Sequence, residues 1–284
     1  METVRRLARA RVIACLVLGS VTVFAQDPAT RAAQTITGIT AEEGISIVVW
    51  ATNLSGPRGL RADPAGGIWV VEESAGRVVK VGPDGRTTVL AEGFQVPHDL
   101  ELDDRGNVYV AETPTGKVLR VSPGGEVSTY VDGLDGPVDL AFNPSDELVV
   151  CDYTGKQVVA FTSSGNRRVL VSGFQPHGLA FDRSGATYVN DISGRRVVKV
   201  MRDGTIEPIA GGIAVPIGLA FGPSGALYVA EKTGGRLLRI KQGGKTETVL
   251  GGLTTPRDPA FDKNGNLYIA ETNAGRILKV SGDF

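Results

Sequence analysis

The chain has 284 residues, of which 21% are charged and 38 are glycine, and its formal net charge at pH 7 is −1. This composition is typical of a β-rich globular protein with many turns and argues against a disordered chain. A net charge so close to zero gives no electrostatic basis for binding nucleic acid, so we expect no nucleic-acid partner.

The N-terminal residues 1–25 have the layout of a secretory signal peptide. Four arginines, at positions 5, 6, 9 and 11, precede the apolar run VIACLVLGSVTVFA, which ends in the small residue Ala25. The run is shorter than the about 20 residues that a membrane span needs, and no longer apolar run follows it. We therefore predict that residues 1–25 are removed on export, and that the mature protein is periplasmic or secreted and has no membrane span.

Residues 26–43 are mostly polar, and we interpret them as a linker that precedes the folded domain of residues 44–284. Cys15 leaves with the signal peptide, so Cys151 is the only cysteine of the predicted mature chain and no intrachain disulfide can form. Cys151 stands where other units of the repeat described next have alanine, which predicts a small buried side chain rather than a reactive thiol.

The rest of the chain repeats one unit six times. Each unit opens with a proline, and these prolines follow one another at intervals of 39 or 40 residues: Pro57, Pro97, Pro137, Pro176, Pro216 and Pro256. Short alternating apolar runs between glycine turns at this period are typical of a β-propeller. We predict an all-β fold, a six-bladed β-propeller with four-stranded antiparallel blades. An open solenoid is the alternative, but it would need terminal units with a polar outer face, which this chain does not have.

The strands of one unit follow from its alternating pattern and its turn residues. In the second unit we expect strands at 99–102, 108–112, 117–121 and 127–131. The sixth unit stops at Phe284, just after its third strand. The segment at 44–54 precedes Pro57 by the interval that separates the fourth strand of the first unit from Pro97, so we predict that it completes the last blade and closes the ring.

Every unit ends its second strand with a carboxylate: Glu72, Glu112, Asp152, Asp191, Glu231 and Glu271. A basic residue follows four or five positions later: Arg77, Lys117, Lys156, Arg195, Arg236 and Arg276. A ring of six carboxylates could suggest cation binding. Because the acid and base occur in all six units, we instead expect the pair to brace the hairpin between the second and third strands.

The two positions after each opening proline differ from unit to unit, and the strand order of a propeller places them at one mouth of the central channel. The first position holds Arg58, His98, Val138, His177, Ile217 and Arg257, and the second holds Gly59, Asp99, Asp139, Gly178, Gly218 and Asp258. Both histidines of the chain fall at the first position. Imidazole titrates near neutral pH and is a common metal ligand, so we interpret His98 and His177 as catalytic or metal-binding residues. The alternative is a histidine that only caps a strand start by bonding the backbone.

Arg58, His98 and Arg257 come from three consecutive blades, with acidic residues next to two of them. We expect the two arginines to hold an anionic group of a ligand, because a guanidinium presents a planar fork of donors. An internally neutralised rim of arginine and aspartate is the alternative. The expected ligand-binding residues are Asp99, Asp139, Asp258 and Asn190. Asn190 replaces the alanine found in other units, so it either meets a neighbouring blade or reaches the channel.

The units resemble NHL repeats over essentially all of residues 57–284, as in the segment PHGLAFDRSGATYVNDISGRRVVKV that begins at Pro176. This resemblance implies a β-propeller and leaves the activity open. Three groups of enzymes have similar blades: the streptogramin lyases, the peptidyl-hydroxyglycine amidating lyases and the SMP-30/gluconolactonase-like propellers.

Each group shares part of its pattern with this chain. Streptogramin lyases have a histidine after the opening proline and a carboxylate fourteen residues later, as His98 with Glu112 and His177 with Asp191. The amidating lyases place zinc-binding histidines in segments similar to PHDL at 97–100 and PHGL at 176–179, although Arg257 stands where the third histidine would be. Gluconolactonase-like propellers draw metal ligands from the same slots, which here supply only aspartates as oxygen donors.

These resemblances imply a functional hypothesis. We expect a propeller that binds a small polar or anionic ligand at the channel mouth and acts as a lyase or lactone hydrolase with a divalent metal such as zinc, calcium or magnesium. His98 or His177 would move a proton, and both would be the metal ligands. We expect no nucleotide or flavin, because no dinucleotide fingerprint or P-loop is present, and we expect a monomer. The alternative is a noncatalytic propeller that binds an exported protein or glycan.

Overall fold

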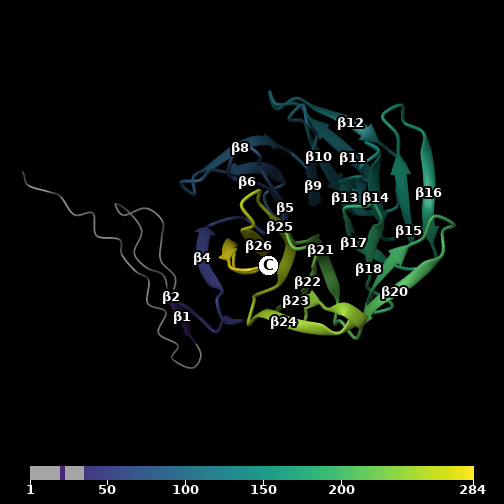
Figure 1. Cartoon of the computed structure of the whole chain (residues 1–284). Helices are drawn as coiled ribbons and strands as arrows, with labels where there is room; N and C mark the ends of the chain where they lie inside the picture. The colour runs from purple at the N-terminus through teal and green to yellow at the C-terminus, as the bar shows by residue number, and fades with distance from the viewer. Residues whose placement is uncertain (1–19, 23–34) are drawn as a thin grey trace, which may run out of the picture.

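The structure is a computed structural model that describes residues 20–22 and 35–284. The predicted signal peptide therefore lies outside the described residues except at its residues 20–22, and so does the first half of the predicted linker. Two short strands, β1 (Ser20–Thr22) and β2 (Thr35–Thr37), pair with each other and lie outside the ring (Figure 1). Among the described residues, no helix is long and apolar enough to cross a membrane.

The predicted six-bladed propeller is confirmed, and each blade is a four-stranded antiparallel sheet (Figure 1). Blades 1 and 2 contain β5 (Pro57–Ala62), β6 (Ile68–Glu72), β7 (Arg77–Val81) and β8 (Thr87–Glu92), then β9 (Pro97–Leu102), β10 (Val108–Glu112), β11 (Lys117–Val121) and β12 (Val127–Val131). Blades 3 and 4 contain β13 (Pro137–Phe142), β14 (Leu148–Asp152), β15 (Gln157–Phe161) and β16 (Arg167–Ser172), then β17 (Pro176–Phe181), β18 (Thr187–Asp191), β19 (Arg196–Val200) and β20 (Ile206–Gly211). Blades 5 and 6 contain β21 (Pro216–Phe221), β22 (Leu227–Glu231), β23 (Arg236–Ile240) and β24 (Thr246–Gly251), then β25 (Pro256–Phe261), β26 (Leu267–Glu271), β27 (Arg276–Ser281) and β4 (Ser46–Ala51). Two 3₁₀ turns, Thr113–Thr115 and Gln242–Gly244, interrupt the loops.

In four of the six blades, the turn between the first and second strands is built from an aspartate and a glycine: Asp63 with Gly66, Asp103 with Gly106, Asp182 with Gly185, and Asp262 with Gly265. In blade 2, Asp103 accepts hydrogen bonds from the backbone N–H groups of Arg105 and Asn107, at 3.0 and 2.8 Å. Gly106 follows with φ of 78°, a left-handed conformation that suits glycine. This local chemistry sets the register of the hairpin and places the turns at one end of the channel.

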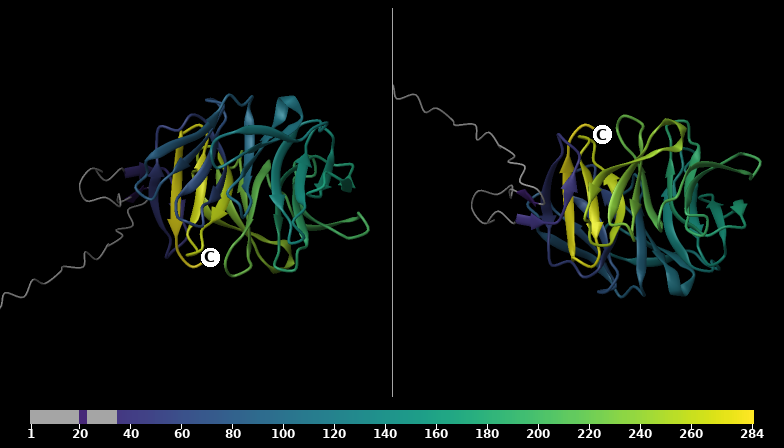
Figure 2. Two further views of the ribbon diagram at one scale, coloured as in Figure 1. Left: turned by 90° about the horizontal axis from the view of Figure 1, so that it is seen from above. Right: turned by 90° about the horizontal axis from the view of Figure 1, so that it is seen from below.

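The last blade is closed by the N-terminal strand, as predicted. Strand β4 pairs antiparallel with β27, with Ile47 opposite Val280 and Ala51 opposite Ile277. Its residue Ile47 is buried in the core between blades 5 and 6, and Trp50 is buried in the core between blades 6 and 1. The pairing of β4 covers the outer edge of β27 and gives the last blade its fourth strand. Figure 2 shows the same strand beside β27 at the edge of the disc.

The last residues of the predicted linker are docked on the propeller. Strand β3 (Thr40–Ala41) adds a fifth strand to blade 5 by pairing with β24. Ile39 is 1% exposed, and the carboxylate of Glu42 lies 2.8 Å from Arg239. The chain is therefore fixed to the ring a few residues before the strand that closes it.

The hydrophobic core is divided among the six interfaces between neighbouring blades. One such cluster combines Val71 and Val78 of blade 1 with Leu100, Val108 and Val110 of blade 2. These side chains belong to the second and third strands of one blade and the inner strands of the next. Packing of each wedge against two neighbours therefore holds the ring together. Cys151 is fully buried in the equivalent cluster between blades 3 and 4, and burial raises the pKa of its thiol, as expected of a structural side chain.

We predict that β4 stabilises the whole domain because it contributes to two of these cores. Ile47→Ala should lower the free energy of unfolding by about 2–5 kcal/mol, while Ser46→Ala, at an exposed position of the same strand, should change it by less than about 0.5 kcal/mol. Deletion of residues 44–54 should unfold the domain. Urea denaturation of the variants measures this, and an Ile47→Ala effect as small as that of Ser46→Ala would show that the strand does not close the ring.

Candidate functional site

The carboxylate at the end of each second strand is a structural brace, as the sequence suggested. In blade 1, Glu72 is fully buried, accepts a hydrogen bond from the N–H of Ser55 at 2.5 Å and pairs with Arg77. Ser55 belongs to the loop that enters the blade, so one carboxylate joins that loop to the hairpin between the second and third strands. Four other blades repeat the bond from the entering loop, through Glu112, Asp152, Glu231 and Glu271.

The predicted base is the partner in only three of the six blades: Arg77, Arg236 and Arg276. In blades 2, 3 and 4 the partners are Thr115, Gln157 and Arg196 instead of Lys117, Lys156 and Arg195. In blades 3 and 4 the predicted base sits in the turn with φ of 51° at both Lys156 and Arg195. The next residue, which opens the third strand opposite the carboxylate, reaches it instead.

The two histidines meet although one blade separates them along the ring. His98 is the second residue of β9 and His177 the second residue of β17, and their ring centroids lie 5.0 Å apart in an edge-to-face contact. Both side chains are buried, at 8% and 6% exposure. The end of the channel where the opening prolines lie, here called the proline-side mouth, is therefore narrow enough for imidazoles from blades 2 and 4 to touch across it.

The neutral tautomer of His177 follows from its hydrogen bond. Its Nδ1 lies 3.2 Å from the carbonyl oxygen of Ile217 on the next blade. A carbonyl oxygen only accepts, so Nδ1 carries the proton and Nε2 is the basic nitrogen. Asn190 donates to the same carbonyl at 3.0 Å, so this residue meets the neighbouring blade. The backbone of Val138 lies beside His98, as the backbone of Ile217 lies beside His177. Unlike Nδ1 of His177, however, Nδ1 of His98 makes no hydrogen bond of good geometry with the described residues.

Positive charge surrounds the imidazole pair. Arg58 and Arg257 lie close enough to lower the pKa of both histidines, after the larger effect of burial, which brings the pKa of His177 to about 3 and that of His98 well below its usual value. Burial and the neighbouring Arg58 lower the pKa of Arg257 itself to about 10. Lys232 belongs to the same group, because Arg257 lowers its pKa. Both imidazoles are therefore uncharged at neutral pH, beside three cations.

Glu73 is the carboxylate that pairs with this cationic group, through an ion pair with Arg58. It follows the brace Glu72, and the equivalent positions of blades 3 and 5 hold Tyr153 and Lys232. The ring of Tyr153 lies 6.2 Å from that of His177. The residues that follow the braces of blades 1, 3 and 5 thus lie at the rim of the proline-side mouth, and the residue at this position varies from blade to blade. Sequence reasoning missed Glu73, Tyr153 and Lys232, although this variation was the signal.

The donor set at the proline-side mouth does not fit a divalent metal. The side chains next to the two imidazoles are guanidinium groups, which repel a cation. Among residues 20–22 and 35–284, no group of three or more His, Cys, Asp or Glu side chains is arranged to hold a metal ion. The hypothesis that His98 and His177 are metal ligands therefore gains no support from the geometry.

The second position after each proline lies deeper in the channel, and two of the glycines there, Gly59 and Gly218, make room for aspartates of the following blade. A Cβ added at Gly218 would lie 2.5 Å from the Cα of Asp258, and one at Gly59 would overlap Asp99. Asp99 is fully buried and Asp139 is 3% exposed. Asp139 accepts a hydrogen bond from the N–H of Leu179 at 2.8 Å.

Arg61 neutralises part of this buried negative charge and was missed in the sequence. Its NH2 group lies 3.0 Å from Asp99 and 3.5 Å from Asp139, and its Nε lies 3.2 Å from Glu101. Burial alone would lower the pKa of Arg61, but the surrounding carboxylates raise it well above the usual value. Burial and the charge of Asp99 raise the pKa of Asp139 strongly and that of Asp258 to about 7. The three aspartates thus form a buried acidic layer inside the channel.

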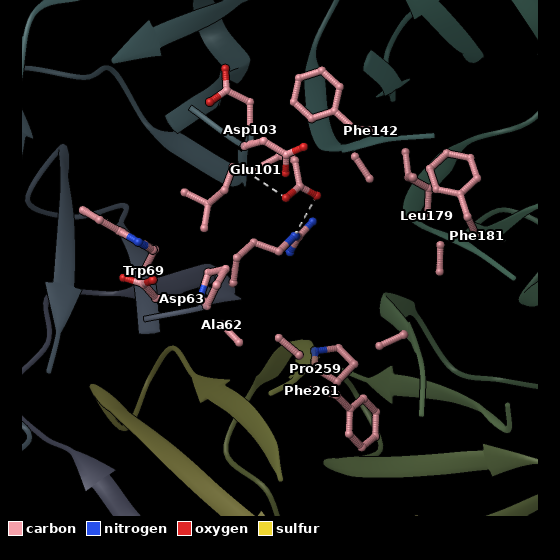
Figure 3. Close-up of a pocket in the computed structure, with 18 of the residues that line it drawn as sticks. Ala62, Asp63, Trp69, Glu101, Asp103, Phe142, Leu179, Phe181, Pro259 and Phe261 are labelled. Carbon is pink, nitrogen blue, oxygen red and sulfur yellow. Dashed lines mark hydrogen bonds and ion pairs between the residues drawn. The ribbon is translucent and has the colours of Figure 1, made fainter. Parts of the chain in front are cut away.

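The opposite end of the channel, here called the turn-side mouth, opens into a cavity of about 840 Å³ (Figure 3). Arg61 and Glu101 line it, together with residues of the turns between the first and second strands. The sequence signal was again a difference between blades, because the position of Arg61 and Glu101 is alanine in the other four: Ala141, Ala180, Ala220 and Ala260.

We predict that His177 makes the protein less stable as the pH falls. The unfolded imidazole gains a proton below about pH 6.5, but the folded one stays neutral down to its pKa of about 3. The free energy of unfolding should therefore fall by up to about 1.4 kcal/mol per pH unit between these values. The raised pKa values of Asp139 and Asp258 give a slope of opposite sign, so the wild-type curve alone does not isolate the histidine.

His177→Gln removes this titration and keeps a group able to bond the Ile217 carbonyl. Urea denaturation from pH 7.5 to pH 4.5 should show the variant gaining stability relative to wild type as the pH falls. A difference between the two proteins that does not change with pH would contradict the burial of a neutral imidazole at this position.

No protein-family model matches the chain, and no curated protein matches it. Solved structures do match. A gluconolactonase from Xanthomonas campestris is similar with a TM-score of 0.76 at 16% identity, over 86% of this chain and 91% of that one. An aldose sugar dehydrogenase from Streptomyces coelicolor, in its PQQ-bound form, gives 0.70 at 18% identity, over 86% and 100%. A virginiamycin B lyase from Staphylococcus aureus, a catalytically inactive variant with a histidine replaced by alanine and solved with quinupristin, gives 0.64 at 16% identity, over 86% and 99%. Identities this low establish the architecture alone: the chain is a six-bladed β-propeller whose fold is similar to those of these solved structures.

Proposed function

We propose that the chain binds a small anionic ligand at the proline-side mouth and transfers a proton to or from it through a neutral imidazole, as a lyase or a lactone hydrolase does. The observation that carries this proposal is the pair of buried imidazoles 5.0 Å apart beside Arg58 and Arg257. Burial of several cations around two neutral bases creates a site that a bound anion would stabilise.

Hydrogen-bonding capacity supports an anionic ligand. The Nε atoms of Arg58 and Arg257 are buried and have no hydrogen-bond partner within the described residues. Lys232 adds a third cation, and Glu73 compensates only part of the charge. A carboxylate or phosphate held by the two guanidinium groups would accept these hydrogen bonds and reduce the repulsion between the arginines.

The proposed chemistry assigns the proton transfer to His177 or His98. In His177 the Nδ1 proton is held by the Ile217 carbonyl, which leaves Nε2 as the base. As a lyase, the base would remove a proton from the carbon next to the ligand's carboxylate. The electron pair of that C–H bond would form a carbon–carbon double bond, and the substituent on the β-carbon would leave with the electrons of its own bond. As a lactone hydrolase, the base would remove a proton from the attacking water, and the guanidinium groups would stabilise the negative charge that develops on oxygen. The bound anion offsets the charge of Arg58 and Arg257, so it would raise the pKa of the imidazole and make it a stronger base.

A divalent metal is not part of this proposal, because the side chains that flank the imidazoles are cationic. The inactive histidine variant of the virginiamycin B lyase supports a role for histidine chemistry in a propeller of this fold. Export through residues 1–25 and a monomeric state remain proposals as well. Export would place the site in the periplasm or outside the cell.

We predict that Arg257→Gln weakens anion binding at least tenfold, because it removes one of the two guanidinium forks and lowers the local charge. Isothermal titration calorimetry with inorganic phosphate and with succinate measures this. Arg105→Gln, at an exposed turn on the other face, removes the same charge and should leave binding unchanged.

Equal losses in Arg257→Gln and Arg105→Gln would assign anion binding to overall charge and contradict the proposed site. The catalytic part is tested by turnover of a panel of lactones and β-substituted carboxylates, with His177→Gln expected to lose turnover but retain binding. Binding without any turnover would favour a noncatalytic propeller. Stoichiometric metal in the purified protein that His98→Ala and His177→Ala both remove would overturn the metal-free site.

A further inference from the structure

A second ligand site is indicated at the turn-side mouth, which the proposed function does not use. The cavity there has a volume of about 840 Å³, a size typical of pockets for small organic ligands. It is lined by residues of all six blades and lies at the opposite end of the channel from His98 and His177. The two mouths are separated by the layer that contains Arg61 and the buried aspartates.

The walls of the cavity are largely apolar and aromatic. Figure 3 shows the rings of Phe142, Phe181 and Phe261 around the opening, with Trp69 on the side of blade 1. All four side chains are half-buried, so each leaves part of its surface open to a ligand. Phe142 packs edge-to-face on Tyr109 at 5.1 Å, and Phe261 packs on Tyr228 at 5.4 Å, which holds these rings in place. A ligand with an apolar body would bury surface against them.

Arg61 lies at the floor of the cavity but has no free donor for an anion. Its Nε donates to Glu101, and its NH1 group donates to the Leu60 carbonyl and Asp99. Its NH2 group donates to Asp99 and to the Leu140 carbonyl. These five contacts occupy the five N–H groups of the guanidinium. Arg61 is therefore a fixed part of the floor, and an incoming carboxylate would find its donors already used.

The remaining charges of the cavity are negative. Four carboxylates line it together with this single guanidinium: Asp63, Glu101, Asp103 and Asp104. Lys80 pairs with Asp63, whereas Asp103 accepts hydrogen bonds only from neutral groups, including the side chains of Asn107 and Tyr109. Glu101 uses one oxygen for Arg61 and the other for the N–H of Leu102, and each carboxylate oxygen can accept a second bond. The floor thus offers acceptors and excess negative charge.

From this geometry we infer that the turn-side mouth binds an organic cation with an apolar body, such as an arylalkyl ammonium ion. The ammonium group would donate to Glu101, and the apolar body would lie among Trp69, Phe142, Phe181 and Phe261. Aromatic faces attract a cation in addition to the carboxylates. A neutral ligand of the same shape would lose the charge-assisted bond, and an anion would be repelled.

The direct test is calorimetry with three probes of nearly equal shape: phenethylammonium, 2-phenylethanol and phenylacetate. We expect phenethylammonium to bind one per chain, at least tenfold more tightly than the alcohol, with no binding of the acid at this mouth. Glu101→Gln should weaken phenethylammonium at least tenfold. Arg257→Gln, at the other mouth, should leave it unchanged, so failure of this proposal is distinguishable from failure of the proposed function.

Because Glu101 accepts a hydrogen bond from Arg61, the Glu101→Gln substitution risks a folding defect. A measurement on the wild-type protein avoids this risk. Crystals soaked with 4-bromophenethylammonium should show an anomalous bromine peak inside the cavity, among the aromatic rings. Equal binding of the amine and the alcohol, no binding of the amine, or a bromine peak only outside the cavity would each overturn the inference.

Discussion

Closure of six sheets around one axis is the constraint on which every other feature depends. The inner strands of neighbouring blades contact each other around the channel, and β4 seals the ring by pairing with β27. Only in a closed ring do His98 and His177, separated by nearly two full units of sequence, touch across one opening. The buried carboxylates at the ends of the second strands support the same geometry, since they bond the loops that deliver these side chains to the mouth.

The channel separates charge along its axis. Arg58, Arg257 and Lys232 gather at the proline-side mouth, whereas carboxylates outnumber Arg61 in the interior and at the turn-side mouth. Burial of like charges is unfavourable at both ends of the channel, and hydrogen bonds and altered pKa values reduce this cost. The imidazoles stay neutral because their pKa values are lowered, and Asp139 holds a proton more tightly because its pKa is raised. Such a gradient favours ligands of opposite charge at the two ends, which is why we assign an anion to one mouth and a cation to the other.

The fold was predicted well because the sequence of a propeller repeats with a nearly constant period, one unit for each blade. The intervals between opening prolines located the blades, and the expected strands at 108–112, 117–121 and 127–131 match β10, β11 and β12. Strand β9 begins two residues earlier than expected, at Pro97, because the proline itself pairs with Glu112. The closing strand could also be predicted, since the missing fourth strand of the last unit has its counterpart before the first.

The site was less predictable. The repeat period shows which position of a blade a residue occupies, but it does not show which residues of other blades its side chain contacts. Comparison of equivalent slots found His98 and His177, yet only the three-dimensional diameter of the channel shows that they meet. The same comparison would have found Arg61 and Glu101, which replace alanine in two adjacent blades, had it been extended to the end of the first strand. Arg61 of blade 1 contacts Asp99 of blade 2 and Asp139 of blade 3, and these contacts leave no trace in the spacing of the sequence.

The most direct measurement of the central claim is an NMR titration of the two imidazoles. The chain has only two histidines, so a His98→Gln variant assigns both signals. If His98 and His177 are buried beside Arg58 and Arg257 in a closed channel, neither imidazole should gain a proton between about pH 8 and about pH 5. An imidazole that titrates near the value of free histidine, about 6.5, would contradict the arrangement at the channel mouth.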